Sequence, residues 1–472
     1  MKEHIKAYIK EHEKDIVDML SSLVEIPSVK TAGNTSAPFG EDCLDALLKI
    51  EEIYKSDGLK TKIEENKNYL LGESEGDERL IGIFSHADVV PAVETDWVYT
   101  RPFSPILKDG FLIGRGAHDN KSGIVGAIWA LRVLEAVGLK PKSRVLLYSG
   151  SDEECGMSDL EVFRKKEELP DFSIIPDNEY PVCRGEKGIL NFFLDFRTPF
   201  DDIISVTGGS AFNIVLGKVD VTLRDRDGLY DEIVNEIKGE KNCSVSSVGG
   251  EITLTAKGKS CHAAHPEGSV NALTVAIGVL ERISISNSDK DILNKALSLL
   301  SNPYFESVGL SSSDREFGRT TTVNGIAKVQ DGRLSLSFDC RYGAEIDADV
   351  LIQKYKRYFD KIGADYSEKQ RLGGYVIPEN APAIEAVMRA WQEITGDGDG
   401  KPYLSFGGTY ARLLPNAVSI GTHTKISTPL PMPEGHGDVH QPDEALDVEG
   451  FLHGIEILAH MIIKIDGVLH RE

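Results

Sequence analysis

The chain has few cysteines for its length, and none of them forms a CxxC pair. Six cysteines are scattered over 472 residues. They stand at Cys43, Cys155, Cys183, Cys243, Cys261 and Cys340. Such spacing argues against a disulfide framework and against a cysteine-ligated zinc site. We therefore expect reduced thiols and a cytoplasmic location.

Long hydrophobic runs are also missing. No stretch of about 18 apolar residues occurs, so we expect no membrane span. The first twenty residues interrupt their apolar positions with charges at every turn, unlike a signal peptide or a transit peptide. This pattern likewise favours the cytoplasm.

Basic residues are fewer than acidic residues. There are 52 lysines and arginines against 75 aspartates and glutamates, which gives a formal net charge of −23. A negative surplus of this size repels nucleic-acid phosphates and anionic lipid surfaces. We therefore expect neither a nucleic-acid partner nor a membrane partner.

The length exceeds what one hydrophobic core usually serves, so two or three domains are expected. Short apolar runs at 80–85 and 144–149 flank an amphipathic segment at 121–137 that ends before a glycine. Strand, helix and strand in this order predict an α/β domain with a mainly parallel sheet. In such sheets the ligand site lies beyond the carboxyl ends of the strands.

Two helices are predicted before this unit. The first has apolar positions from Ile5 to Leu23 on one face and stops at Pro27. The second runs from about 41 to 57 and is capped by Gly58. Its inward residues are predicted to be Leu44, Leu47, Leu48 and Tyr54.

The pattern changes near residue 185 to alternating strands, which we expect to be antiparallel. The strands are predicted at 189–196, 251–258 and 333–341, and helices between them at about 227–238, 270–283, 289–300 and 346–362. Residues 185–380 are therefore predicted to form an inserted α+β domain. Helical patterns at 381–395 and 443–465 then complete the first domain, which would consist of 1–184 and 381–472.

Five carboxylate and imidazole side chains stand where strands are predicted to end or helices to begin. They are His86, Asp119, Glu154, Asp177 and His440. Singly, each has an ordinary structural explanation; Asp119, for example, could cap the helix that begins near Lys121. Together they could supply the oxygen and nitrogen ligands of two adjacent zinc-type ions. The set predicts a hydrolase.

Two further acidic residues lie beside these candidates. Asp88, two residues after His86, could accept the second ring proton of that histidine and so fix its tautomer. Glu153 adjoins Glu154, and neighbouring side chains cannot easily bind one metal in the same way. One of the two can therefore ligate while the other stays available as a general base.

The motifs that carry these residues resemble those of the co-catalytic zinc metallopeptidases, a family that includes aminoacylases, carboxypeptidases, succinyl-diaminopimelate desuccinylases and cytosolic dipeptidases. The resemblance rests on SHADVVP at 85–91, GRGAHDNKSG at 114–123, SDEECG at 151–156 and HQPDE at 440–444. It runs nearly end to end. The long insert and the GGTYAR segment at 407–412 are most similar to the PepV-type dipeptidase branch.

This resemblance implies a phosphorylase/hydrolase-like catalytic domain with a lid, and two divalent metal ions. Zn²⁺ is the expected ion, with Mn²⁺ or Co²⁺ also compatible with mixed oxygen and nitrogen ligands. By the resemblance Asp119 would bridge the ions. His86 and Asp177 would hold one ion, and Glu154 and His440 the other. A metal-bridging hydroxide would attack the scissile amide, with Glu153 as the general base.

The resemblance also assigns substrate contacts. His262 fits the lid histidine that stabilises the oxyanion, and Arg341 resembles the arginine that binds the terminal carboxylate of the substrate. Asn213 is their companion, and Gly408 and Thr409 would contact the substrate from the GGTYAR segment. Without the resemblance, a histidine after a strand and an arginine on a strand have structural explanations as well.

A lid of nearly 200 residues favours a monomeric dipeptidase with a small peptide substrate. The alternative within the same chemistry is a di-zinc N-acyl-amino-acid deacylase of the aminoacylase or desuccinylase type. A non-catalytic metal-binding protein is a third interpretation, although an intact Glu153 and His262 argue against it. Cys155, beside Glu154, is either an oxidation-sensitive thiol or a small buried residue.

Overall fold

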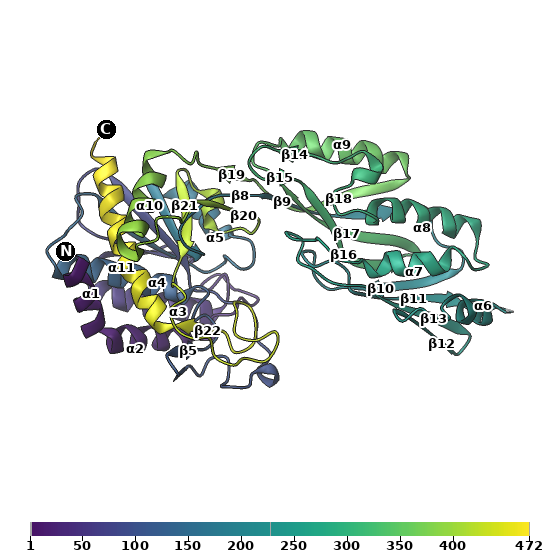
Figure 1. Ribbon diagram of the computed structural model, residues 1–472, viewed down its shortest axis with the longest axis horizontal. Helices are drawn as coiled ribbons and strands as arrows, with labels where there is room; N and C mark the ends of the chain where they lie inside the picture. The colour runs from purple at the N-terminus through teal and green to yellow at the C-terminus, as the bar shows by residue number, and fades with distance from the viewer. Residues whose placement is uncertain (1, 227, 472) are drawn as a thin grey trace. The chain divides into compact units, whose positions relative to one another are not determined.

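The computed structural model describes residues 2–226 and 228–471. Residues 1, 227 and 472 lie outside the described residues. One predicted helix begins at residue 227, and the predicted first domain begins at residue 1 and ends at residue 472. The chain divides into two compact units (Figure 1). The first is Met1–Gly185 with Ile377–Glu472, and the second is Glu186–Val376.

The first unit is built on a mixed sheet with parallel strands at its centre. The order is β1, β2, β6, β3, β7, β21, β8. Parallel pairing joins β3 (Leu80–His86), β6 (Arg144–Gly150), β7 (Phe172–Asn178) and β21 (Ala417–Gly421). Antiparallel pairing adds β1 (Lys60–Ile63), β2 (Tyr69–Glu73) and β8 (Cys183–Glu186). The predicted α/β class with a parallel-containing sheet is confirmed.

Other elements of this unit surround the sheet. The helices are α1 (Lys2–Glu11), α2 (Glu13–Val24), α3 (Glu41–Ser56), α4 (Lys121–Ala136), α5 (Ser158–Lys166), α10 (Pro382–Thr395) and α11 (Val448–Leu469), with 3-10 turns η1 (Glu94–Asp96) and η3 (Tyr410–Leu413). Strand β20 (Tyr403–Ser405) pairs with β8. A small separate sheet has the order β22 (Ala445–Asp447), β5 (Phe111–Ile113), β4 (Ile106–Lys108).

Strand β3 shows why the central strands read as continuous apolar runs. All seven of its residues are buried. Ile81 and Ile83 belong to the core that α4 and α11 share, whereas Phe84 packs edge-on against Phe163 of α5. Both faces of the strand are therefore covered, as expected for a parallel sheet.

Three sequence predictions in this unit need correction. The first predicted helix is two helices, α1 and α2, separated at His12. On α3, Leu48 is 42% exposed, because the buried face runs through Ala46, Leu47 and Ile50 and Leu48 lies one residue beyond it. Helix α11 begins at Val448, five residues later than predicted, because Ala445–Asp447 pair with β5.

The second unit is an antiparallel sheet covered by helices. The strand order is β12, β13, β11, β10, β16, β17, β9, β18, and each of these pairs is antiparallel, as predicted. The strands are β9 (Gly188–Phe196), β10 (Ile203–Gly208), β11 (Lys218–Arg224), β12 (Cys243–Val248), β13 (Glu251–Lys257), β16 (Thr321–Gln330), β17 (Arg333–Tyr342) and β18 (Ala364–Leu372). Short β14 (Ser313–Asp314) and β15 (Gly318–Arg319) form a separate two-stranded sheet, and β19 (Tyr375–Val376) follows β8 in the strand order of the other large sheet.

Helices α7 and α9 lie against this sheet, and α8 packs on α7 (Figure 1). The helices are α6 (Leu229–Glu236), α7 (Ala272–Leu280), α8 (Asn287–Leu300) and α9 (Ala348–Lys361), with the 3-10 turn η2 (Glu306–Val308). Their apolar faces and the inward residues of the strands form a second hydrophobic core, distinct from that of the first unit.

Among the described residues, none of the helices is long and apolar enough to cross a membrane. No disulfide joins the cysteines in this part of the chain.

Asp289 of α8 binds the backbone at the start of β10. Its fully buried carboxylate accepts hydrogen bonds from the backbone N–H groups of Asp201 at 2.7 Å, Asp202 at 2.9 Å and Ile203 at 3.1 Å. We predict that Asp289→Ala lowers the free energy of unfolding of the second unit by about 2–4 kcal/mol, because three donors lose their acceptor. The control is Asp291→Ala, which removes only an exposed ion pair with Lys295. Equal losses in urea denaturation would contradict the assignment.

Candidate metal centre

The parallel pairing brings three strand ends to one edge of the first unit's sheet. His86 is the last residue of β3 and lies opposite Gly150, the last residue of β6. Glu153 and Glu154 stand three and four residues after the end of β6, and Asp177 is the penultimate residue of β7, on the other side of β3. The sequence places chemically related groups at this edge because the strands run in the same direction.

Asp119 lies between two imidazoles. Its Oδ1 is 3.1 Å from Nε2 of His86, and its Oδ2 is 3.0 Å from Nε2 of His440. Asp177 Oδ2 lies 3.7 Å from the same His86 nitrogen, and Glu154 Oε1 lies 3.2 Å from the His440 nitrogen. The two oxygens of the Asp119 carboxylate therefore face two different groups of side chains that could bind metal.

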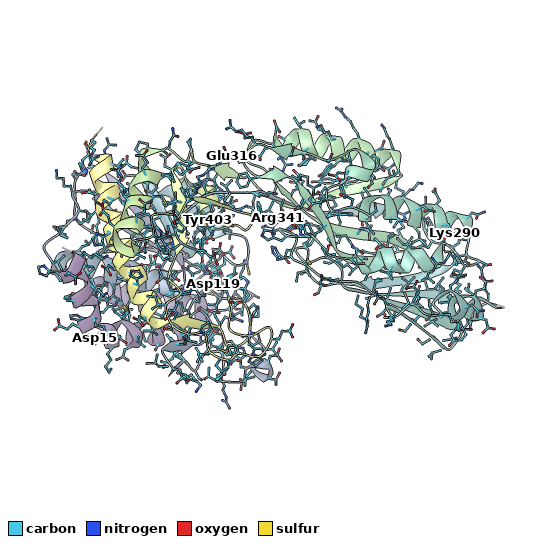
Figure 2. All side chains as sticks on the ribbon, viewed as in Figure 1. Asp15, Asp119, Lys290, Glu316, Arg341 and Tyr403 are labelled. Carbon is cyan, nitrogen blue, oxygen red and sulfur yellow. The ribbon has the colours of Figure 1, made fainter. Side chains whose placement is uncertain are left out.

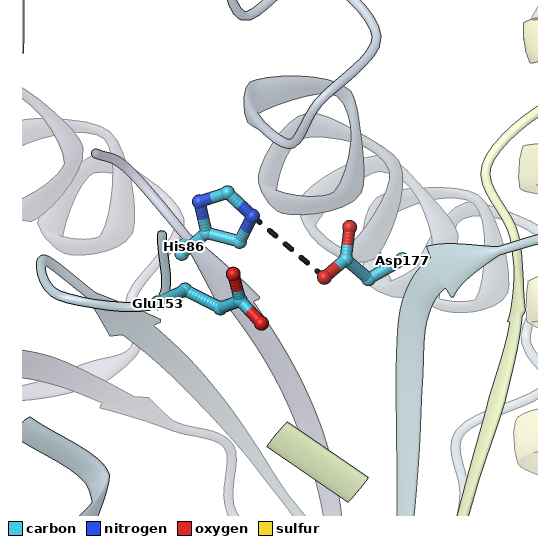
Figure 3. Close-up of side chains that lie close together, drawn as sticks. All are labelled: His86, Glu153 and Asp177. Atoms are coloured by element: carbon cyan, nitrogen blue, oxygen red, sulfur yellow. Dashed lines mark ion pairs between the residues drawn. The ribbon is translucent and has the colours of Figure 1, made fainter. Parts of the chain in front are cut away.

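Glu153 belongs to the same cluster. His86, Glu153 and Asp177 (Figure 3) offer ligand atoms that all lie within 4.8 Å of one another. The same holds for His86, Asp119 and Glu154. In Figure 3, Glu153 and Asp177 both approach the ring of His86. Oε1 of Glu153 is buried and has no hydrogen-bond partner among the described residues. The position of Glu153 suits either a metal ligand or a general base that faces the space between the ligand atoms.

The electrostatics of the cluster show an excess of buried negative charge. Burial raises the pKa of Glu153 well above its usual range, and raises that of Asp177 to about 7 together with the charge of Asp119. Burial also raises the pKa of Glu154. Conversely, the carboxylates of Asp119 and Glu154 raise the pKa of His440 to about 11.

The pKa of His86 is raised as well. Burial works to lower its pKa, but its contacts with Asp119 and Asp177 prevail and raise the pKa well above the usual range. Because divalent cations would offset the repulsion among four carboxylates, this donor set fits a metal centre. Within the described part of the chain, Nε2 of His86 is buried and makes no hydrogen bond of good geometry, which fits the same role.

Asp119 does not cap the following helix. The N-cap residue of α4 is Asn120, and among the residues that the structure describes no side-chain cap bond is made there. Asn120 was not among the residues singled out from the sequence, yet its buried Nδ2 donates to Pro176 O at 2.6 Å and to Asp177 Oδ1 at 2.9 Å. It thereby fixes Asp177, and its place beside Asp119 in the GRGAHDNKSG motif was the available signal.

Asp88 supports the site in a different way from the one predicted. The second ring nitrogen of His86, Nδ1, bonds to the backbone carbonyl of Asp88 at 2.9 Å, while the carboxylate lies 3.5 Å away. The carboxylate instead accepts the backbone N–H groups of Glu153 at 3.3 Å and Glu154 at 3.2 Å. Asp88 thus orients two neighbouring segments of the site.

The second unit brings its three predicted residues together. Ala263 N–H, next to His262, donates to Asn213 O at 2.8 Å. Ala263 O accepts the hydroxyl of Thr321 at 3.0 Å, and Thr321 pairs with Arg341 across β16 and β17. Figure 2 labels Arg341 in this unit and Asp119 in the first.

Arg341 and His262 are each held by a specific contact. Nε and Nη2 of Arg341 donate to the Asp339 carboxylate at 2.6 and 2.9 Å, and both side chains are buried. Nδ1 of His262 accepts the backbone N–H of Ala264 at 3.2 Å, which assigns the ring proton of the neutral form to Nε2. Burial and the nearby Arg341 lower the pKa of His262.

The remaining predicted residues lie in the first unit. A Cβ atom at Gly408 would lie 2.2 Å from Nη2 of Arg412, so a larger residue there would displace the Arg412 guanidinium. The hydroxyl of Thr409 accepts the N–H of Ala411 and caps η3. Cys155 is exposed, so its interpretation as a small buried residue is wrong.

Comparison with known proteins agrees with this site. The sequence pattern of the family described as "Peptidase family M20/M25/M40" matches residues 82–464. A protein of Staphylococcus haemolyticus named as a putative dipeptidase is 26% identical over 479 residues, which covers 98% of this chain and 99% of that one. A protein of Staphylococcus epidermidis with the same name is also 26% identical, covering 97% and 98%.

Solved structures share the fold. Human carnosine dipeptidase 1 superposes with a TM-score of 0.59 at 14% identity, covering 99% of this chain and 100% of that one. The dipeptidase Dug1p of Saccharomyces cerevisiae gives a TM-score of 0.60 at 13% identity and covers 99% of each chain. The family match spans most of the chain and includes every residue of the metal cluster, as the sequence motifs predicted. The chain therefore belongs to peptidase family M20/M25/M40, and it is a peptidase.

Proposed function

We propose that the protein is a metal-dependent dipeptidase that uses two divalent ions, with Zn²⁺ as the expected ion. The observation that carries the proposal is the position of Asp119, with one carboxylate oxygen toward His86 and the other toward His440. A carboxylate that faces two imidazoles in this way suits a bridge between two cations. The names of the staphylococcal relatives and of two of the solved structures support dipeptides as the substrate class.

The chain's residues divide naturally between two ions. His86 and Asp177 would hold one, Glu154 and His440 the other, and Asp119 both. When bound, such ions supply Lewis acidity, which makes water a nucleophile near neutral pH and polarises a carbonyl group. Mixed carboxylate and imidazole donors suit Zn²⁺, and they also accept Mn²⁺ or Co²⁺.

Glu153 is proposed as the general base. Its backbone is anchored by Asp88, and its unpartnered Oε1 lies within the cluster beside His86 and Asp177. It would take the proton from the attacking water and then deliver it to the leaving amine. Cations bound nearby would favour the ionised form that this role requires.

The second unit is proposed to contribute substrate contacts. His262 carries its ring proton on Nε2 and can donate it to an oxyanion, and its lowered pKa keeps the ring neutral. Arg341, held along its Nε edge by Asp339, is proposed to bind the terminal carboxylate of the substrate. Asn213, Gly408 and Thr409 are proposed as further substrate contacts.

We also propose an oligomeric state and a cellular location for the protein. We expect a monomer, because an insert of this length can supply from one chain what shorter members take from a partner subunit. The absence of CxxC pairs supports a cytoplasmic location.

Replacing Glu153 tests the assignment of the base. We predict that Glu153→Gln retains both metal ions, measured by elemental analysis, but lowers kcat by about 100- to 10,000-fold, because proton transfer is lost while the ligands remain. Glu161→Gln on α5, where the native side chain is exposed and lies 4.0 Å from Lys165, is the matched control and should retain full activity. Unchanged turnover of Glu153→Gln would remove Glu153 from the mechanism, and loss of one metal would make it a ligand instead.

A substrate panel tests the proposed function itself. The purified, metal-loaded protein is assayed with a dipeptide, the same dipeptide with a C-terminal amide, a tetrapeptide and an N-acetyl amino acid. We predict the highest kcat/KM for the free dipeptide, with at least roughly tenfold loss on the amide, because the charge-assisted bonds to Arg341 require a carboxylate. A preference for the N-acetyl amino acid would replace the proposal with a deacylase.

A further inference from the structure

Glu444 is a buried carboxylate whose hydrogen bonds converge on the loop that carries Asp119. It is 0% exposed. Its Oε1 accepts the backbone N–H groups of Gly116 at 3.1 Å, His118 at 2.9 Å and Asp119 at 3.1 Å. Its Oε2 accepts Nη1 of Arg115 at 2.5 Å. Four donors from one five-residue segment therefore bind one side chain from a segment more than 320 residues away.

These bonds lie in a tightly turned part of the Asp119 loop. Gly116 has a φ of +87°, and a Cβ atom there would meet the side chains of Val89 and Lys121. With the amide of Asp119 fixed by Glu444, the carboxylate of Asp119 is directed toward both His86 and His440. A change at Glu444 thus acts on the two proposed ions through Asp119.

Glu444 also links this loop to the segment of His440, four residues earlier in the chain. Gly114 N–H donates to the backbone carbonyl of Glu444 at 2.9 Å, so the two segments are joined through main chain as well as side chain. Asp443, the preceding residue, accepts the N–H groups of Val98 and Tyr99. The His440 segment is therefore tied to the first half of the unit at two consecutive residues.

A carboxylate is needed at this position. Arg115 is 2% exposed and its guanidinium also lies over the ring of Trp97, 5.6 Å from the centroid. A glutamine in place of Glu444 would keep one oxygen for the three amides but would direct an NH₂ group at Nη1 of Arg115. Two donors would then face each other in a site without solvent, which costs free energy and displaces one side of the contact.

We propose that Glu444 is a positioning residue for the metal centre, which holds Asp119 in register with His86 and His440 by accepting the amides of its loop. This inference rests on the proposed function, because it requires that Asp119 bind metal. The competing explanation is that Arg115 and Glu444 form a buried ion pair that matters only for folding.

Zinc affinity separates the two explanations. The full-length protein is stripped of metal, and Zn²⁺ is titrated in competition with a chromophoric chelator. We expect Glu444→Gln to weaken Zn²⁺ binding by about 10- to 100-fold, the usual effect of removing a group that orients a metal ligand.

The matched control is Asp466→Asn. Asp466 is 9% exposed and likewise accepts backbone amides, from Lys142 at 3.1 Å and Ser143 at 2.8 Å. These residues precede β6, at the opposite end of the strand from Gly150. Both variants should lose thermal stability, but Asp466→Asn should bind Zn²⁺ within about twofold of the wild-type protein. Wild-type affinity in Glu444→Gln would overturn the inference.

A double variant tests the same role if Glu444→Gln does not fold. Arg115→Leu combined with Glu444→Gln removes the opposed donors and leaves the glutamine oxygen for the three amides. We expect this double variant to bind Zn²⁺ more tightly than Glu444→Gln. The role of the amides would be contradicted if the double variant bound Zn²⁺ no more tightly than Glu444→Gln. It would also be contradicted if Glu444→Gln were unfolded and the double variant bound no Zn²⁺. If the wild-type protein itself bound no Zn²⁺, the proposed function would fail, which is distinguishable from the failure of Glu444 alone.

Discussion

The first unit depends on the concentration of like charge at one edge of its sheet. Asp119, Glu153, Glu154 and Asp177 meet around His86, and the rise in the pKa of three of these carboxylates expresses the cost of that arrangement. Such a cluster costs free energy, because burial disfavours each ionised carboxylate. The surrounding framework holds it in place: parallel strands align the ends, Asp88 fixes the backbone of the two glutamates, and Asn120 fixes Asp177. Cations are the simplest compensation for this charge, and family membership agrees with peptide hydrolysis as their use.

Much of this site could be predicted from the sequence because parallel strands convert chain order into spatial proximity. His86 ends an apolar run, and the register of β3 with β6 carries it opposite Gly150, next to the glutamate pair. Contacts between distant loops could not be predicted in the same way. Whether Asp119 caps α4 or faces the imidazoles depends on which groups arrive from residue 440, and whether Asp88 accepts through its carbonyl or its carboxylate depends on the turn after β3. The role of Glu444 was not visible either, since its partners lie more than 320 residues earlier.

Secondary structure shows the same division between local and distant information. The helix of residues 41–56 and its glycine cap follow from local pattern, and Gly58 indeed has a φ of +71°. The inward face of that helix was misjudged at Leu48, because adjacent leucines lie about 100° apart and only packing decides which is covered. The late start of α11 has a tertiary cause, since pairing with β5 holds Ala445–Asp447 extended. The antiparallel sheet of the second unit was predictable from alternation, whereas the proximity of Asn213, His262 and Arg341 arises from strand register and loop contacts.

Anomalous X-ray diffraction can test the proposal that Asp119 bridges two metal ions. Crystals of the full-length protein equilibrated with Zn²⁺ are measured at the zinc absorption edge. We expect two anomalous peaks on either side of the Asp119 carboxylate, one beside His86 and Asp177 and the other beside His440 and Glu154. A single peak, or peaks that do not contact Asp119, would contradict it.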